Sequence, residues 1–138
     1  MQQLTQEILR LCREYGECRV EVERMEEARR VKNALESVCS MARQRLDISD
    51  PALLLALLDA CEVTRDEGML QEVLDVVGRN LDRLAVSAES VKLLACCYYY
   101  VEEKECVERA GRMLEELRKM GRGEEELADA ETILEELT

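Results

Sequence analysis

Apolar positions divide the chain into seven stretches that have the periodicity of α-helices. In five stretches the apolar residues recur every three or four positions and form one stripe, with polar residues on the other faces. The other two stretches, PALLLALLDACEV and SVKLLACCYYYV, are apolar on nearly every side. A helix that is apolar all round must be surrounded by protein, and one-sided helices can surround it. The pattern therefore predicts an all-α fold built around these two helices.

Start and stop signals separate the predicted helices. Asp50 before Pro51 is a favourable N-cap, Thr64 with Glu67 has the form of a capping box, and Gly16 is expected to end the first helix. The sequence thus predicts a single domain, residues 1–138, with the following parts: a hairpin of helices 2–15 and 18–46, related hairpins 51–84 and 88–120, and an acidic capping helix 124–137. That last helix could equally dock on a basic groove or pair with another chain.

The two central helices belong to an internal repeat. A shift of 36 residues aligns each apolar helix and the amphipathic helix after it with its counterpart, and five of ten compared pairs are identical. Leu58 then falls on Leu94, and Leu81 falls on Leu117. The unit resembles the helical hairpins of the armadillo, HEAT and tetratricopeptide repeat superfamilies. This resemblance implies about seven helices in antiparallel hairpins, arranged as a right-handed, α-solenoid-like stack that binds proteins along one face.

The resemblance is to the hairpin unit and not to one family. Leu94 and Tyr98 fall at the Leu and Tyr positions of the tetratricopeptide motif, but Val107 stands where that motif has its next small residue. The Trp, Gly and closing Pro of the motif are missing. No binding residue is therefore carried over from any of these families.

The charge of the chain favours some partners over others. The net charge is −12, and residues 51–138 hold 21 acids and 10 bases. An acidic field of this size repels phosphate backbones, which argues against nucleic acid and favours a basic protein or peptide. It could also serve only to keep the domain soluble. Arg19, Arg24, Arg29, Arg30 and Lys32 are interleaved with acids, so an RNA-binding helical repeat is a lower-ranked alternative.

Catalytic, cofactor and metal motifs are missing from the sequence. The chain has no histidine, no Gly-rich phosphate loop and no CxxC pair, so we expect neither enzymatic activity nor a cofactor or metal. No uninterrupted apolar run exceeds nine residues, which predicts no membrane span. Seven cysteines follow no disulfide framework, which indicates free thiols packed in the core of a cytoplasmic protein in a reducing compartment.

The most unusual stretch is Tyr98-Tyr99-Tyr100. Successive helical residues point about 100° apart, so the three rings cannot share one buried face and at least one should reach the surface. Together with the acidic residues Glu102 and Glu103, these tyrosines are the predicted partner-binding site. Alternatively, the rings fill the core in place of the missing Phe and Trp.

From these features we expect a non-enzymatic protein–protein interaction module: an adaptor, a scaffold or an assembly chaperone. It would bind a protein or peptide in a groove between helices. The alternative is a structural subunit of a larger multi-protein complex. The identity of the partner, the oligomeric state and the pathway do not follow from the sequence.

Overall fold

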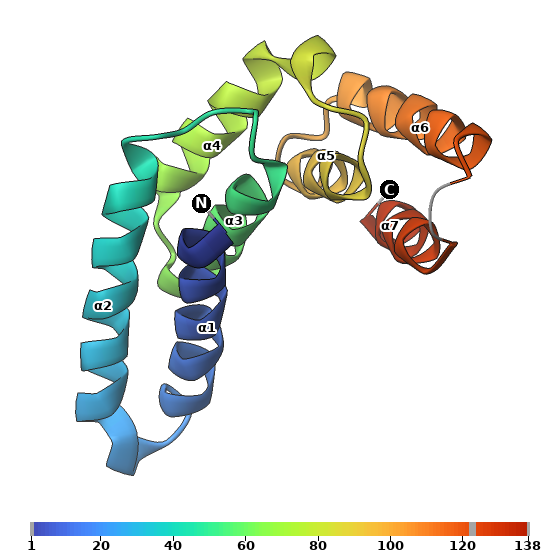
Figure 1. The fold of residues 1–138 in the computed structure, drawn as a ribbon. Helices are drawn as coiled ribbons and strands as arrows, with labels where there is room; N and C mark the ends of the chain where they lie inside the picture. Colours follow the sequence, from blue (N-terminus) through green and yellow to red (C-terminus); the bar gives the residue numbers. More distant parts are fainter. Residues whose placement is uncertain (1, 122–123, 138) are drawn as a thin grey trace.

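The computed structural model describes residues 2–121 and 124–137, and it confirms the all-α expectation (Figure 1). These residues form seven α-helices and two short 3-10 helices, with no strand among them. The helices are α1 (Gln2–Cys18), η1 (Val22–Arg24), α2 (Met25–Arg43), α3 (Pro51–Thr64), α4 (Glu67–Arg79), η2 (Leu81–Arg83), α5 (Ala88–Val101), α6 (Lys104–Lys119) and α7 (Glu124–Leu137).

The odd-numbered helices follow one another in space. α1 packs against α3, α3 against α5, and α5 against α7, while α2, α4 and α6 each pack against the odd-numbered helix that precedes them. Figure 1 shows α2, α4 and α6 along the outer side of an arc, with α1, α3, α5 and α7 inside it. Each of the two central helices therefore has neighbours on both flanks and on its outer side.

The core confirms that the two apolar helices lie at the centre. Seven of the fourteen residues in each of α3 and α5 are buried. In α3 these are Leu53, Leu54, Ala56, Leu57, Leu58, Ala60 and Cys61. In α5 they are Ala88, Ser90, Val91, Leu93, Leu94, Ala95 and Cys97. Burial on this scale, at about 25 cal/mol per Å² of apolar surface, is what holds the surrounding one-sided helices in place.

Several predicted helix boundaries are wrong. α1 continues past Gly16 to Cys18, and α2 begins only at Met25. The N-cap of α4 is Asp66, whose carboxylate accepts the Met69 backbone N–H at 3.0 Å.

Thr64 does not cap α4, because it still belongs to α3. Its hydroxyl donates to the carbonyl of Ala60 at 2.7 Å. The next residue, Arg65, has a left-handed backbone (φ 57°) that ends α3. Asp66 is therefore the residue left between the two helices, in the position to cap α4. Asp50 does cap α3 as predicted, accepting the Leu53 N–H at 3.2 Å.

The repeat has a period of 37 residues, so the 36-residue shift is wrong by one position. α3 and α5 begin 37 residues apart, and so do α4 and α6. The two left-handed residues that end the central helices, Arg65 and Glu102, have the same spacing. Leu94 therefore aligns with Leu57 and not with Leu58. The extra residue matters because one position turns a helix by about 100° and changes which side chains face the core.

No helix among the described residues has both the length and the apolar character needed to cross a bilayer.

Candidate partner-binding site

The three tyrosines lie in the last turn of α5 and have different environments. Tyr98 and Tyr100 are half-buried, whereas the side chain of Tyr99 is 59% exposed. The rings of Tyr99 and Tyr100 meet edge to face, with centroids 5.2 Å apart and planes at 82°. The helical spacing correctly predicted that one ring would reach the surface.

Tyr100 links the two central helices through Glu62. Its hydroxyl donates to the Glu62 carboxylate at 2.9 Å, from α5 to α3. Burial and then this hydrogen bond raise the pKa of Tyr100, so the hydroxyl stays protonated and remains a donor. The bond fixes the position of the Glu62 carboxylate next to the exposed ring of Tyr99.

Two cavities adjoin Tyr99 and Tyr100. The first, which we call the acidic cavity, has a volume of about 300 Å³ and is lined by Leu58, Asp59, Glu62, Cys96, Tyr99, Tyr100 and Leu137. The second, which we call the Arg65 cavity, has a volume of about 330 Å³ and is lined by Cys61, Glu62, Arg65, Asp66, Glu67, Leu70, Tyr99 and Tyr100. Glu62 and the two tyrosines border both cavities, so they separate two adjacent recesses.

Two carboxylates, those of Asp59 and Glu62, line the acidic cavity. In the part of the chain that the structure describes, neither Asp59 nor Glu62 forms an ion pair. Burial raises the pKa of Asp59, and the nearby charge of Glu62 adds to the shift. Both residues lie on α3 one turn apart, so their charges repel each other.

These side chains belong to the side of α3 and α5 that no other helix covers fully. We call this surface the open face; it consists of Leu55, Asp59 and Glu62 on α3 and of Lys92, Cys96 and Tyr99 on α5, all exposed or half-buried. The spacing of four and three residues is the same in both helices, and each pair is 37 residues apart. Lys92 is held by Asp129 of α7 at 2.7 Å, so α7 borders the open face.

Only part of the site predicted from sequence comes together. Tyr99 and Tyr100 line the cavities, whereas Tyr98, Glu102 and Glu103 line neither. The N–H of Glu102 donates to the Tyr98 carbonyl at 2.8 Å and closes α5. Glu103 stands at the N-cap position of α6 without a side-chain cap. Asp59, Glu62, Cys96 and Leu137 also line the acidic cavity but were not among the predicted site residues. The one sequence signal for them is the pair of acids within an otherwise apolar helix.

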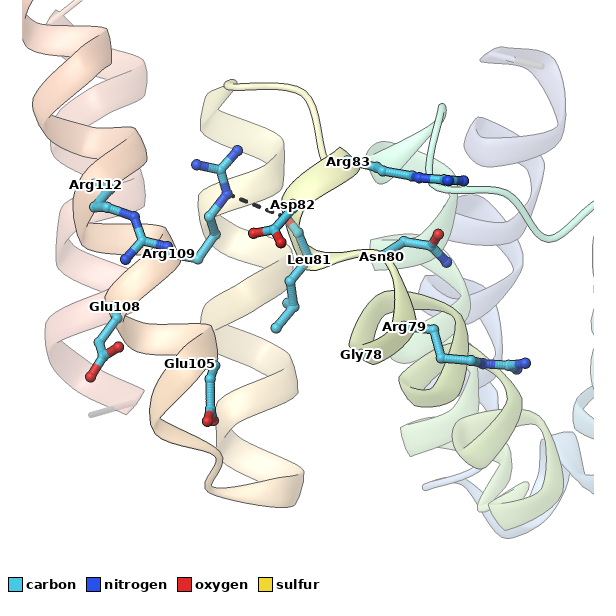
Figure 2. Close-up of a pocket in the computed structure, with 10 residues that line it drawn as sticks. All are labelled: Gly78, Arg79, Asn80, Leu81, Asp82, Arg83, Glu105, Glu108, Arg109 and Arg112. Atoms are coloured by element: carbon cyan, nitrogen blue, oxygen red, sulfur yellow. Dashed lines mark hydrogen bonds between the residues drawn. The ribbon is translucent and has the colours of Figure 1, made fainter.

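A further cavity, of about 360 Å³, lies between η2 and α6 (Figure 2). Arg109 donates from α6 to the carbonyls of Leu81 at 3.3 Å and Leu84 at 3.4 Å. Figure 2 shows Arg79 and Arg83 extending away from Arg109 and from the acids of α6. The cavity is lined by both acidic and basic residues, and the two hydrogen bonds of Arg109 connect α6 to η2 and the residue after it. We therefore assign it a structural role.

The cysteines are free thiols, as predicted. Six of the seven are buried and Cys96 is half-buried. Burial raises the pKa of Cys12 and Cys61 to about 12, and that of Cys39 and Cys96 to about 11. Within the described ranges, no three Cys, Asp or Glu side chains gather as a metal site would need.

Because the folded thiols stay protonated, we expect the native chain to react slowly with a disulfide reagent such as DTNB at pH 8. In urea, where the chain is unfolded, all seven thiols should react rapidly. A raised pKa also makes the folded state bind more protons than the unfolded state above the ordinary thiol pKa. Stability should therefore be unaffected below about pH 8.5 and should fall as the pH rises further. Rapid reaction of several thiols in the native chain would contradict this assignment.

No protein-family model matches the chain, and the searches of curated proteins and of solved structures found no match either.

Proposed function

We propose that this chain is a non-enzymatic module that binds a protein or peptide partner on the open face, with Tyr99 as the anchor. The observation that carries the proposal is the position of Tyr99: a large ring, 59% exposed, between two cavities. An exposed aromatic ring next to a recess is a common feature of interface hot spots, which are enriched in Tyr. The role would be that of an adaptor, a scaffold or an assembly chaperone.

The proposal includes a solenoid-like, right-handed stack of antiparallel hairpins. It is supported by the 37-residue repeat of α3–α4 and α5–α6, and by the order in which the odd-numbered helices pack. Stacked hairpins leave one side of their first helices open, and repeat proteins use that side for binding. Seven thiols without a disulfide support a reducing compartment such as the cytoplasm.

The experiment is a selection of random peptides displayed on phage against the folded chain. The selected peptides should bind the Tyr99→Ala variant about tenfold or more weakly than the original chain. Truncating a hot-spot residue lowers the binding free energy by at least about 1.4–2 kcal/mol. Tyr99 is exposed, so the variant should fold normally. Affinities are measured by isothermal titration, and folding is checked by circular dichroism.

Met120→Ala is the matched control, since Met120 is a large side chain that is 56% exposed, directly follows α6 and lines neither cavity. It should leave peptide affinity unchanged. Peptides that bind the Tyr99→Ala variant as tightly as the original chain would remove Tyr99 from the site and overturn the proposal.

A structural subunit of a larger complex is the second candidate function. It is favoured by the connection between α1 and α2, where Val20, Val22 and Met25 are 75%, 81% and 60% exposed. Exposed apolar side chains this close together are typical of a surface that another protein covers. A measurement of solution mass separates the candidates, because a chain that is monomeric and stable alone is not an obligate subunit.

A further inference from the structure

The acidic cavity combines three kinds of surface within about 300 Å³. Leu58, Cys96 and Leu137 supply apolar walls, Asp59 and Glu62 supply carboxylates, and Tyr99 supplies an aromatic ring. We propose that this cavity accepts a lysine or arginine side chain of the partner. The inference rests on the proposed function and adds which chemical group of the partner enters the site.

The charges favour a cation. Asp59 and Glu62 have no ion-pair partner among the described residues, whereas Lys92, the basic residue of the open face, is already paired with Asp129 of α7 at 2.7 Å. Two unpaired carboxylates one helical turn apart repel each other, and a cation placed between them replaces that repulsion with attraction. Burial and the charge of Glu62 already raise the pKa of Asp59, which is the response expected of a carboxylate that lacks a counter-charge.

The shape favours a long side chain with its charge at the end. Lysine and arginine have apolar stems that can lie along Leu58, Cys96 and Leu137 while the charged head reaches the carboxylates. The ring of Tyr99 adds a surface on which a cation can rest. Because Tyr100 holds the Glu62 carboxylate at 2.9 Å, this acceptor is in place before the partner arrives.

Other occupants fit less well. An acidic side chain would meet Asp59 and Glu62 as well as a chain whose net charge is −12. A purely apolar side chain would remove water from both carboxylates without replacing the lost hydrogen bonds. A basic side chain is the one common residue type that satisfies the apolar walls, the carboxylates and the ring together.

The first test uses n-butylguanidinium and n-butylammonium ions as probes, with n-pentanol as a neutral control of similar length. Both cations should shift the NMR signals of Tyr99 and Leu137 in a saturable way, and pentanol should not. Asp59→Asn should weaken cation binding by at least about fivefold, the effect of losing one energetically significant contact. Asp75→Asn removes the same charge from α4, outside the cavity, and should change binding little.

Asp59→Asn also has a stability readout. A carboxylate whose pKa is raised on folding opposes folding at any pH above its folded pKa, so the neutral Asn should raise the unfolding midpoint at pH 7. The variant is thus expected to bind less and to be more stable. Equal cation binding by the original chain and the Asp59→Asn variant would overturn the inference.

The second test separates this inference from the proposed function. Peptides that depend on Tyr99 should contain a lysine or arginine, and replacing that residue by norleucine should lower affinity at least about fivefold. If Tyr99-dependent peptides bind equally well with norleucine, the basic-side-chain inference fails and the proposed function stands. If no selected peptide depends on Tyr99, the proposed function fails first.

Discussion

Replacing Leu57 by alanine is expected to lower the free energy of unfolding by about 2–5 kcal/mol, the range for deleting a fully buried leucine side chain. Leu57 is 0% exposed and lies in the middle of α3, which packs against α1, α2, α4 and α5. Helices on several sides limit how far the structure can close over the gap. A domain of this size has only about 5–15 kcal/mol of stability, so the loss would be a large fraction of the total.

Urea unfolding followed by circular dichroism measures this loss, and two further variants control for it. Leu55→Ala makes the same chemical change two residues away, on the open face, and should cost clearly less. Leu94→Ala should match Leu57→Ala in size, because Leu94 is also 0% exposed and holds the same position in the 37-residue repeat. Equal effects of Leu55→Ala and Leu57→Ala would contradict the placement of α3 at the centre.

The fold class and the central helices could be predicted because apolar residues, which become buried, recur along the sequence with the spacing of a helix. α3 and α5 are apolar on most sides, and in both cases the residue before the helix has a side chain that can cap it. Asp50 accepts the Leu53 N–H at 3.2 Å, and Ser87 accepts the Ser90 N–H at 3.1 Å. Such signals depend only on neighbouring residues, so a single sequence is enough to find them.

The register of the repeat could not be predicted in this way. Identical residues favoured a shift of 36, since Leu58 matches Leu94 and Cys61 matches Cys97. The structure instead aligns positions by environment: Leu57 with Leu94, and Glu62 with Tyr99. In helices rich in leucine and cysteine, chance identities are frequent, whereas the position of a side chain relative to the core is fixed by packing.

The candidate site was only half predictable for the same reason. The exposure of one tyrosine followed from helical geometry, but Asp59 and Glu62 were hidden within a segment interpreted as apolar all round. Which side of that helix stays uncovered depends on where α1, α4, α5 and α7 pack, and this is a property of the whole fold. Glu102 and Glu103 were included because they are close in sequence, yet they serve the turn between α5 and α6.

The second large effect concerns α7. Leu127 and Ala130 of this helix are buried, and Arg118 of α6 forms an ion pair with Glu131 at 2.5 Å. Ala130 is 0% exposed and belongs to the hydrophobic core, so Ala130→Asp would place an unpaired carboxylate in that core. Burying such a charge costs several kcal/mol, which we expect to be enough to detach α7.

A detached α7 would uncover apolar side chains of α5, and the variant should therefore lose stability and self-associate. Sedimentation velocity measures the association, and limited proteolysis reports the release of the helix. Ala128→Asp is the matched control, because it adds the same charge to the same helix at an exposed position. If Ala130→Asp remains monomeric and as stable as the control, α7 is not needed to cover α5.

The outcome also bears on the binding site, because Leu137 at the end of α7 forms one wall of the acidic cavity. If α7 is a cap, Ala130→Asp should weaken the binding of n-butylguanidinium even though Asp59, Glu62 and Tyr99 are unchanged. If α7 is instead an arm that docks on another chain, its release should leave a folded monomer that still binds the cation through α3 and α5. Measuring association and cation binding on this one variant therefore distinguishes the two roles of α7.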